Sequence, residues 1–148
     1  MISRKLPRAI LSAAQCKALD RRAIETLGIP GYQLMQRAAH ASLALIRQRW
    51  PDIRSVSIWV GSGNNGGDGV VLARMAHELG WQVQLVVAAL DVRDRATNEA
   101  AEAWRDLPVD ITPEVYTDNL QVGAELIVDA LLGIGLRGEV REPLCSMI

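Results

Sequence analysis

The segment GSGNNGGDG, residues 61–69, is the feature that most restricts the fold. It follows directly on a short β-rich apolar run, residues 55–60, and leads into a helical pattern. Between a strand and a helix, a G-x-G-x-x-G motif indicates a phosphate-binding turn, because glycines let the backbone approach a phosphate closely. The N-terminus of the following helix also offers free N–H groups to an anion. The segment therefore predicts a nucleotide-handling α/β domain.

Strands and helices alternate along the rest of the chain. Strands are expected at residues 55–60, 81–90, 115–116 and 126–130. Helices are expected at residues 68–79 and 94–107, the latter with an apolar side of Ala96, Ala100, Ala103 and Trp104. This alternation predicts βαβ units and a parallel sheet. The strands are apolar throughout, which is typical of a sheet covered on both faces.

Two amphipathic helices precede the sheet. Ser12 and Gln15 form a capping-box pattern before the first helix, in which Leu19, Ala23, Ile24 and Leu27 recur at helical spacing. The second helix is expected to end at residues 50–52, and its apolar face consists of Leu34, Met35, Ala38, Ala41, Leu45 and Ile46. We expect both helices to wrap onto the sheet.

Length and composition limit the class of protein. The 148 residues suit one domain, and 49% of them are hydrophobic, which is ample for one core. No apolar run approaches the ~20 residues that span a bilayer. Residues 1–8 are basic but lack the apolar centre of a secretory signal, and an organellar leader is the less favoured alternative. Cys16 and Cys145 have no metal-ligand spacing, so we expect two reduced thiols in a cytoplasmic protein.

Charge is unevenly distributed. Residues 1–50 hold nine Lys or Arg against two Asp or Glu, whereas residues 51–148 hold seven against fifteen. Such asymmetry can indicate a nucleic-acid arm, but these basic residues are spaced along helical patterns and no tryptophan accompanies a basic cluster. A solvated helix face is the favoured interpretation, with no nucleic acid and no membrane among the expected partners.

The polar residues of the first glycine loop do not suit an ordinary dinucleotide fingerprint. A carboxylate at Asp68 repels a pyrophosphate unless it caps the helix or meets a cation or a hydroxyl. The acid expected to bind ribose has only Asp91 as a candidate, 25 residues beyond Gly66. The alternative is a tight strand-to-helix turn with Asp68 as the N-cap.

A second glycine loop follows the strand at residues 126–130. Ligands in open α/β sheets bind at the carboxyl ends of strands, so both loops are expected to face one crevice. Asp129, at a strand end, can coordinate a cation or a substrate hydroxyl, or can accept hydrogen bonds from the loop. Arg137 suits a phosphate or a solvated surface equally well.

Three segments together resemble the YjeF N-terminal domain family, which includes the NAD(P)H-hydrate epimerases. They are NNGGDG at residues 64–69, VDALLGIGLRG at residues 128–138 and GYQLMQRAA at residues 31–39. The resemblance runs from about Ser12 to the last residue. It implies a Rossmann-like three-layer α/β/α sandwich with a mostly parallel sheet, preceded here by two helices.

The resemblance also implies a function. Family members interconvert the R and S forms of hydrated NADH and NADPH, bind potassium and commonly form homodimers, and a fused or separate ADP/ATP-dependent dehydratase then restores the cofactor. By motif, Asn65 and Asp129 are the implied potassium ligands. The implied substrate contacts are Asn64, Asn65, Gly66, Gly67, Asp68, Gly133, Ile134, Gly135, Leu136, Arg137, Gly138 and Glu139.

The chain departs from the family pattern in places. Ala39 stands where a Gly is usual, and neither the later D-[IL]-P-S-G segment nor the Lys-Pro motif is present. Residues 142–148 resemble the first turn of a helix, with Pro143 at the favoured position. We therefore expect residues 1–148 to be a C-terminally incomplete domain whose catalytic acid or base is not assigned.

Two other function classes compete with the epimerase. One is a non-catalytic nucleotide- or protein-binding scaffold on the same fold, and the other is an ordinary NAD(P) dehydrogenase or methyltransferase. The NNGGD loop together with Asp129 favours an enzyme over a scaffold. The doubled asparagine and Asp68 argue against a dehydrogenase.

Overall fold

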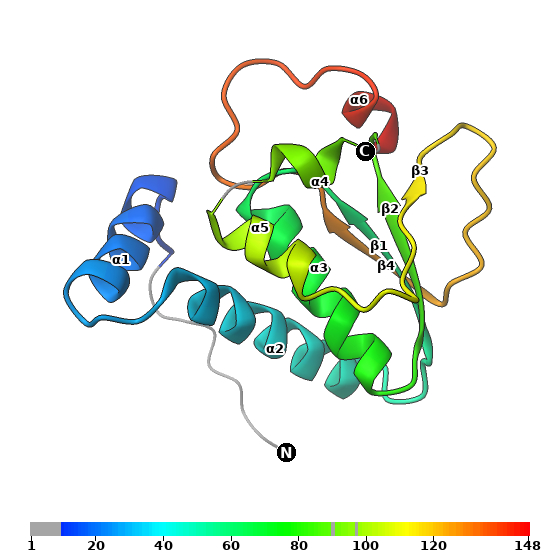
Figure 1. The fold of residues 1–148 in the computed structure, drawn as a ribbon, viewed down its shortest axis with the longest axis horizontal. Coiled ribbons are helices and arrows are strands. Elements are labelled where there is room, and N and C mark those ends of the chain that lie inside the picture. The colour runs from blue at the N-terminus through cyan, green and yellow to red at the C-terminus, as the bar shows by residue number, and fades with distance from the viewer. Residues whose placement is uncertain (1–9, 90, 97) are drawn as a thin grey trace.

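The chain forms one parallel sheet with helices on both faces. The computed structural model describes residues 10–89, 91–96 and 98–148, so the basic segment 1–8 lies outside it (Figure 1). The strands are β1 (Ser55–Val60), β2 (Gln82–Val87), β3 (Glu114–Val115) and β4 (Leu126–Ala130). They run in the order β3-β2-β1-β4, and every neighbouring pair is parallel. The predicted α/β class and parallel sheet are confirmed.

The core lies between the sheet and α3 (Asn64–Glu78) with α5 (Asn98–Arg105). Alternate residues of β1 and β2 point into it, among them Ile58, Val60 and Leu85, all fully buried. Val86 points to the opposite face, where it packs with Leu131 and with Met147 of α6 (Leu144–Met147). Burial of such side chains stabilises the fold by roughly 1.5–3 kcal/mol each.

Helix α2 (Gly31–Arg49) packs on α3 and α5, so it lies outside α3 rather than directly on the sheet (Figure 1). The prediction that this helix wraps onto the sheet is therefore wrong. Its buried stripe is Met35, Ala39, Leu43 and Ile46, the row that faces α3. The predicted face was right in part: Met35 and Ile46 are buried as expected, but Leu34 is half-buried, and Ala38, Ala41 and Leu45 are exposed.

Helix α1 (Ala13–Glu25) stands apart from the rest of the fold (Figure 1). Its predicted capping box is confirmed, since Ser12 N–H donates to Gln15 Oε1 at 2.8 Å and Gln15 N–H donates to Ser12 Oγ at 3.3 Å. No side chain of α1 is buried, and Leu19 remains 53% exposed. The expectation that α1 wraps onto the sheet is wrong, because within the described residues its main packing partner is α2.

The helix predicted at residues 94–107 is divided in two. Residues Val92–Arg95 form α4, and α5 begins at Asn98, which has a positive φ of 51°. Ala100, Ala103 and Trp104 are buried as predicted. The end of the strand predicted at residues 81–90 falls on residue 90, outside the described residues, and β2 ends at Val87. No described helix is both long and apolar enough to cross a bilayer.

Candidate functional site

Helix α3 begins within the glycine segment. Its first residue is Asn64 and its N-cap is Gly63, which makes no side-chain capping bond. The predicted helix start at residue 68 is therefore wrong by four residues. Asp68 lies in the second turn of α3, so the alternative in which it caps the helix is also wrong. Glycines weaken a helix intrinsically, and tertiary packing overrides that tendency here.

The glycines of α3 seat the helix against its neighbours. A Cβ on Gly66 would collide with the carbonyl oxygen of Gly61, and a Cβ on Gly69 would lie 2.7 Å from Cβ of Ala130 in β4. On the opposite side of the helix, a Cβ on Gly67 would lie 2.6 Å from Cε of Met35 in α2. Close packing accounts for these three glycines, and only Gly63 and the helix N-terminus remain open to a ligand.

The two glycine loops meet at the carboxyl ends of β1 and β4. Gly61 N–H donates to Ala130 O at 3.2 Å, and Asn65 Nδ2 donates to Leu132 O at 3.1 Å. Between them lies an open cleft of about 860 Å³, here called the main cleft, lined by residues 61–65, Asp68 and residues 131–136. The expectation that both loops face one crevice is confirmed.

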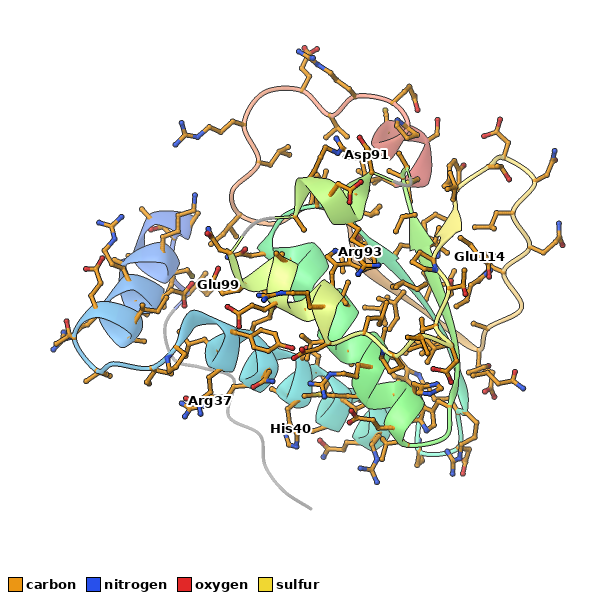
Figure 2. The ribbon with its side chains drawn as sticks, in the orientation of Figure 1. Arg37, His40, Asp91, Arg93, Glu99 and Glu114 are labelled. Atoms are coloured by element: carbon orange, nitrogen blue, oxygen red, sulfur yellow. The ribbon has the colours of Figure 1, made fainter. Side chains whose placement is uncertain are left out.

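Some residues expected at the site lie outside the main cleft. Arg137 and Gly138 are exposed beyond its lining, and Glu139 lines a separate hollow of about 340 Å³ beside α4. Asp91, the candidate ribose-binding acid, forms an ion pair with Arg95 at 3.2 Å and is not among the lining residues (Figure 2). The main cleft thus brings Asn64, Asn65 and Asp68 together with residues 133–136, whereas Gly66 and Gly67 are buried behind its wall and residues 137–139 lie outside it.

Two side chains offer oxygens to a hard cation. Asn65 and Asp129 line one pocket of about 360 Å³ along the edge of β4, here called the edge pocket. Asn65 uses its amide nitrogen on Leu132 O, and Asp129 uses Oδ1 to accept from Leu131 N–H at 2.9 Å. The remaining amide and carboxylate oxygens form the kind of donor set that suits an alkali or alkaline-earth ion. No group of three or more His, Cys, Asp or Glu side chains suited to a metal occurs among the described residues.

Asp68 lies where three hollows adjoin. It lines the main cleft, the edge pocket and a smaller pocket of about 170 Å³ next to α1 and α2. Burial, and to a lesser extent the nearby carboxylate of Asp20, together raise the pKa of its carboxyl to about 6. Among the described residues no hydrogen bond reaches this carboxyl. It can therefore exchange a proton near neutral pH.

Helix α1 contributes residues that sequence analysis missed. Lys17 and Asp20 line the main cleft, and Asp20 also lines the smaller pocket. That pocket is shared with Glu99 of α5, which is labelled in Figure 2. No local motif marks either residue, because they precede the glycine loops by more than 40 residues. Only the fold brings them to the site.

Comparison with known proteins gives a family match and close relatives. The model of the family described as YjeF-related protein N-terminus matches residues 31–148. The chain is 41% identical to the bifunctional NAD(P)H-hydrate repair enzyme Nnr of Coxiella burnetii, over 90% of this chain and 27% of that protein. It is 35% identical to the NAD(P)H-hydrate epimerase of Rhodobacter capsulatus, over 86% of this chain and 63% of that one.

A solved structure shares the fold. The crystal structure of the yeast protein ynu0 superposes with a TM-score of 0.74 at 20% identity, covering 94% of this chain and 63% of that one. At this identity the likeness concerns the fold alone. The chain spans between 27% and 63% of the length of these proteins.

Proposed function

The chain belongs to the YjeF-related protein N-terminus family, and on that premise we propose that its full-length protein interconverts the R and S forms of hydrated NADH and NADPH. One observation carries the proposal beyond family membership. The two glycine loops meet at one cleft, and Asp68, a carboxyl with a pKa near 6, lies on its wall.

The dinucleotide would occupy the main cleft. The free N–H groups at the N-terminus of α3 would face its phosphates, with Asn64 and Asn65 as polar neighbours. Residues 133–136 line the opposite side. Gly66 and Gly67 are buried against neighbouring elements and do not line the cleft, so they would serve the site by seating α3 rather than through side chains. Arg137, Gly138 and Glu139 reach only a part of the substrate that extends past the cleft.

Epimerisation needs the hydroxyl to leave the hydrated ring carbon and return, or the ring to open, and either route needs an acid and a base. We assign both roles on the first route to Asp68. The C–O bond breaks with its electron pair on oxygen, the proton of Asp68 moves to that oxygen, and water leaves. The ring nitrogen stabilises the cation that remains. Water then adds from the other face, and the Asp68 carboxylate takes up the released proton.

Potassium is proposed at the edge pocket. Asn65 and Asp129 would each contribute the oxygen that the fold leaves free. A bound monovalent cation would supply positive charge beside the substrate oxygens. The remaining oxygen ligands would come from water, substrate or other parts of the full-length protein.

We propose the partner enzyme and the oligomeric state of the full-length protein separately, because the relatives' names bear only on the partner enzyme. Because one relative is named a bifunctional NAD(P)H-hydrate repair enzyme, we propose that an ADP/ATP-dependent dehydratase, fused or separate, uses the epimerised product in the cytoplasm. We also propose a homodimer, which size-exclusion chromatography with light scattering tests directly.

A scaffold function on the same fold remains the second candidate, and one observation favours it. The outer edge of β4 carries exposed Ile127, beside exposed Leu45 and Trp50 of the neighbouring α2 segment. Among the described residues no strand pairs with this edge of β4. Such an apolar edge is a site where another polypeptide, or a further part of the full-length protein, can add.

The decisive experiment uses the full-length protein and chemically prepared S and R epimers of hydrated NADH. Chromatography follows their exchange with and without potassium. The proposal expects exchange faster than the spontaneous rate and faster still with potassium. If exchange is not accelerated in either condition, the proposed epimerase function is wrong and the scaffold function is the remaining candidate.

A further inference from the structure

Helix α1 forms a wall of the main cleft that the family model does not include. The model begins at residue 31, whereas α1 ends at Glu25. The similarity to the Coxiella protein and to the yeast structure nevertheless covers 90% and 94% of the chain, so both extend into the segment before residue 31. The helix therefore belongs to what these proteins share with this chain.

Lys17 and Asp20 are the residues that α1 presents to the main cleft. They are three positions apart, so they lie on one face of the helix, towards the loops at residues 61–65 and 131–136. We infer that α1 is part of the dinucleotide site and that Lys17 pairs with a phosphate of the substrate. This inference rests on the proposed function and adds a specificity-determining residue to it.

Charge balance in the main cleft supports this role. Its charged lining side chains, within the part of the chain that the structure describes, are Lys17, Asp20 and Asp68. Lys17 is thus the only side-chain cation there, facing two carboxyl groups. A pyrophosphate carries two negative charges, and carboxylates alone would repel it. The ammonium of Lys17, with the N-terminus of α3, supplies the opposite charge that such a ligand requires.

Lys17 is also available for a ligand. It is exposed, and no ion pair of its ammonium occurs among the described residues. The neighbouring Arg21 and Arg22 do not line the main cleft. Since α1 buries none of its own side chains, few protein contacts hold it in place. A bound phosphate therefore adds a contact that draws α1 towards the glycine loops.

The test compares three variants of the full-length protein: Lys17→Ala, Lys17→Arg and, as a matched control on the same helix, Arg21→Ala. Two substrates are used, hydrated NADH and hydrated dihydronicotinamide riboside, which has the same reduced ring but lacks phosphate. We expect Lys17→Ala to raise KM for hydrated NADH about tenfold, the factor of one charge-assisted hydrogen bond. Its kcat should stay unchanged, and its kcat/KM for the riboside should equal that of the unmodified protein.

Lys17→Arg should restore most of the lost affinity, and Arg21→Ala should behave as the unmodified protein. An unchanged KM in Lys17→Ala overturns the inference. An equal loss on both substrates overturns it too, because it shows a structural role of the helix rather than a phosphate contact.

A binding measurement keeps this inference separate from the epimerase proposal. Calorimetry with ADP-ribose, an unreactive ligand with the same pyrophosphate, needs no turnover. If the unmodified protein shows no epimerisation, the proposed function fails, but weaker ADP-ribose binding by Lys17→Ala still supports the phosphate contact. Equal ADP-ribose affinity in the two proteins, or no binding by the unmodified protein, overturns it.

Discussion

Carboxyl groups near the two ends of β1 and β4 have pKa values shifted in opposite directions. At the amino end, Glu125 Oε2 accepts from Arg54 N–H at 2.7 Å, from Ser55 N–H at 3.0 Å and from Ser55 Oγ at 3.0 Å. These bonds hold the pKa of Glu125 below its usual range. At the carboxyl end, burial raises the pKa of Asp68 to about 6, and no described donor reaches it.

We interpret the carboxyl group at one end of this strand pair as structural and the one at the other end as functional. At the amino end, a satisfied carboxylate ties β4 to β1, and the glycine there, Gly123, has open space around it. At the carboxyl end, the half-buried carboxyl of Asp68 has no partner among the described residues, and it lies beside Gly61 and Gly66, which pack against backbone. Groups with unsatisfied or perturbed chemistry are typical of reactive sites. The contrast therefore supports our proposal that the reactive site lies at the carboxyl end of the strands.

The largest expected effect is on catalysis. Asp68→Asn keeps the size of the side chain but removes its proton exchange, so kcat for epimer exchange should fall about 10²- to 10⁴-fold. Chromatography of the two epimers measures it, with Asp118→Asn, an exposed carboxylate outside the main cleft, as the control. Near-normal kcat in Asp68→Asn would remove Asp68 from the mechanism.

The next effect concerns packing. Gly66→Ala places a Cβ against the Gly61 carbonyl, whereas Gly123→Ala places one in open space. Overpacking typically costs roughly 1–3 kcal/mol, so Gly66→Ala should lower the free energy of unfolding by about that amount in urea titrations. Gly123→Ala should change it by less than about 0.5 kcal/mol. Similar losses in both variants would show that α3 is not seated as described.

Glu125→Gln tests the amino end. Its carboxylate has a lowered pKa in the folded protein, so it stabilises the fold above the ordinary value of 4.5, and that stabilisation is lost as pH falls through the lowered pKa. The variant should therefore have a lower Tm than the unmodified protein at neutral pH, with a difference that shrinks in acid. A Tm difference that does not change with pH would show that Glu125 stabilises the fold through its shape and not through its charge.

Asp68→Asn should act in the opposite direction on stability. A folded pKa of about 6, above the usual 3.8, means that protonation stabilises the fold fully below 3.8 and that this gain is lost as pH rises through 6. Asparagine is neutral throughout, so the variant should have the higher Tm above about pH 7 and an equal one below about pH 4. The test uses potassium-free buffer. A Tm of the variant below that of the unmodified protein above pH 7 would show that burial of the Asp68 carboxylate does not destabilise the fold.

The smallest effect comes from α1. Asp20 is the second cause of the raised pKa of Asp68, after burial. In Asp20→Asn the pKa of Asp68 should fall part of the way towards its usual value. The descending limb of kcat against pH, which reports loss of the Asp68 proton, should move to lower pH. If this limb does not move, the charge of Asp20 on α1 does not influence the pKa of Asp68.

Much of the carboxyl end was predictable from local patterns. The apolar run at residues 126–130 became β4 with the same bounds, and the glycine segments after two strands predicted one shared crevice. Parallel strands bring their carboxyl ends to one edge, so the predicted parallel direction of the strands was enough for this inference. The misfit of Asp68 with a phosphate loop also pointed to an unusual site.

Other features depend on contacts between distant residues. The start of α3 at Asn64 follows from the close approach of Gly66 to Gly61 and of Gly69 to β4, which outweighs the low helix propensity of glycine. The face of α2 depends on α3 lying between it and the sheet. The meeting of Lys17 and Asp20 with the main cleft has no counterpart in local sequence.

A carboxyl-carbon NMR titration of the full-length protein in potassium-free buffer tests the contrast between the two ends most directly. The account predicts that Asp68 titrates near pH 6 and Glu125 below its usual 4.5. Addition of ADP-ribose should then shift the Asp68 signal and leave the Glu125 signal in place. Titration of Asp68 near its usual 3.8, or an Asp68 signal indifferent to saturating ADP-ribose, would contradict it.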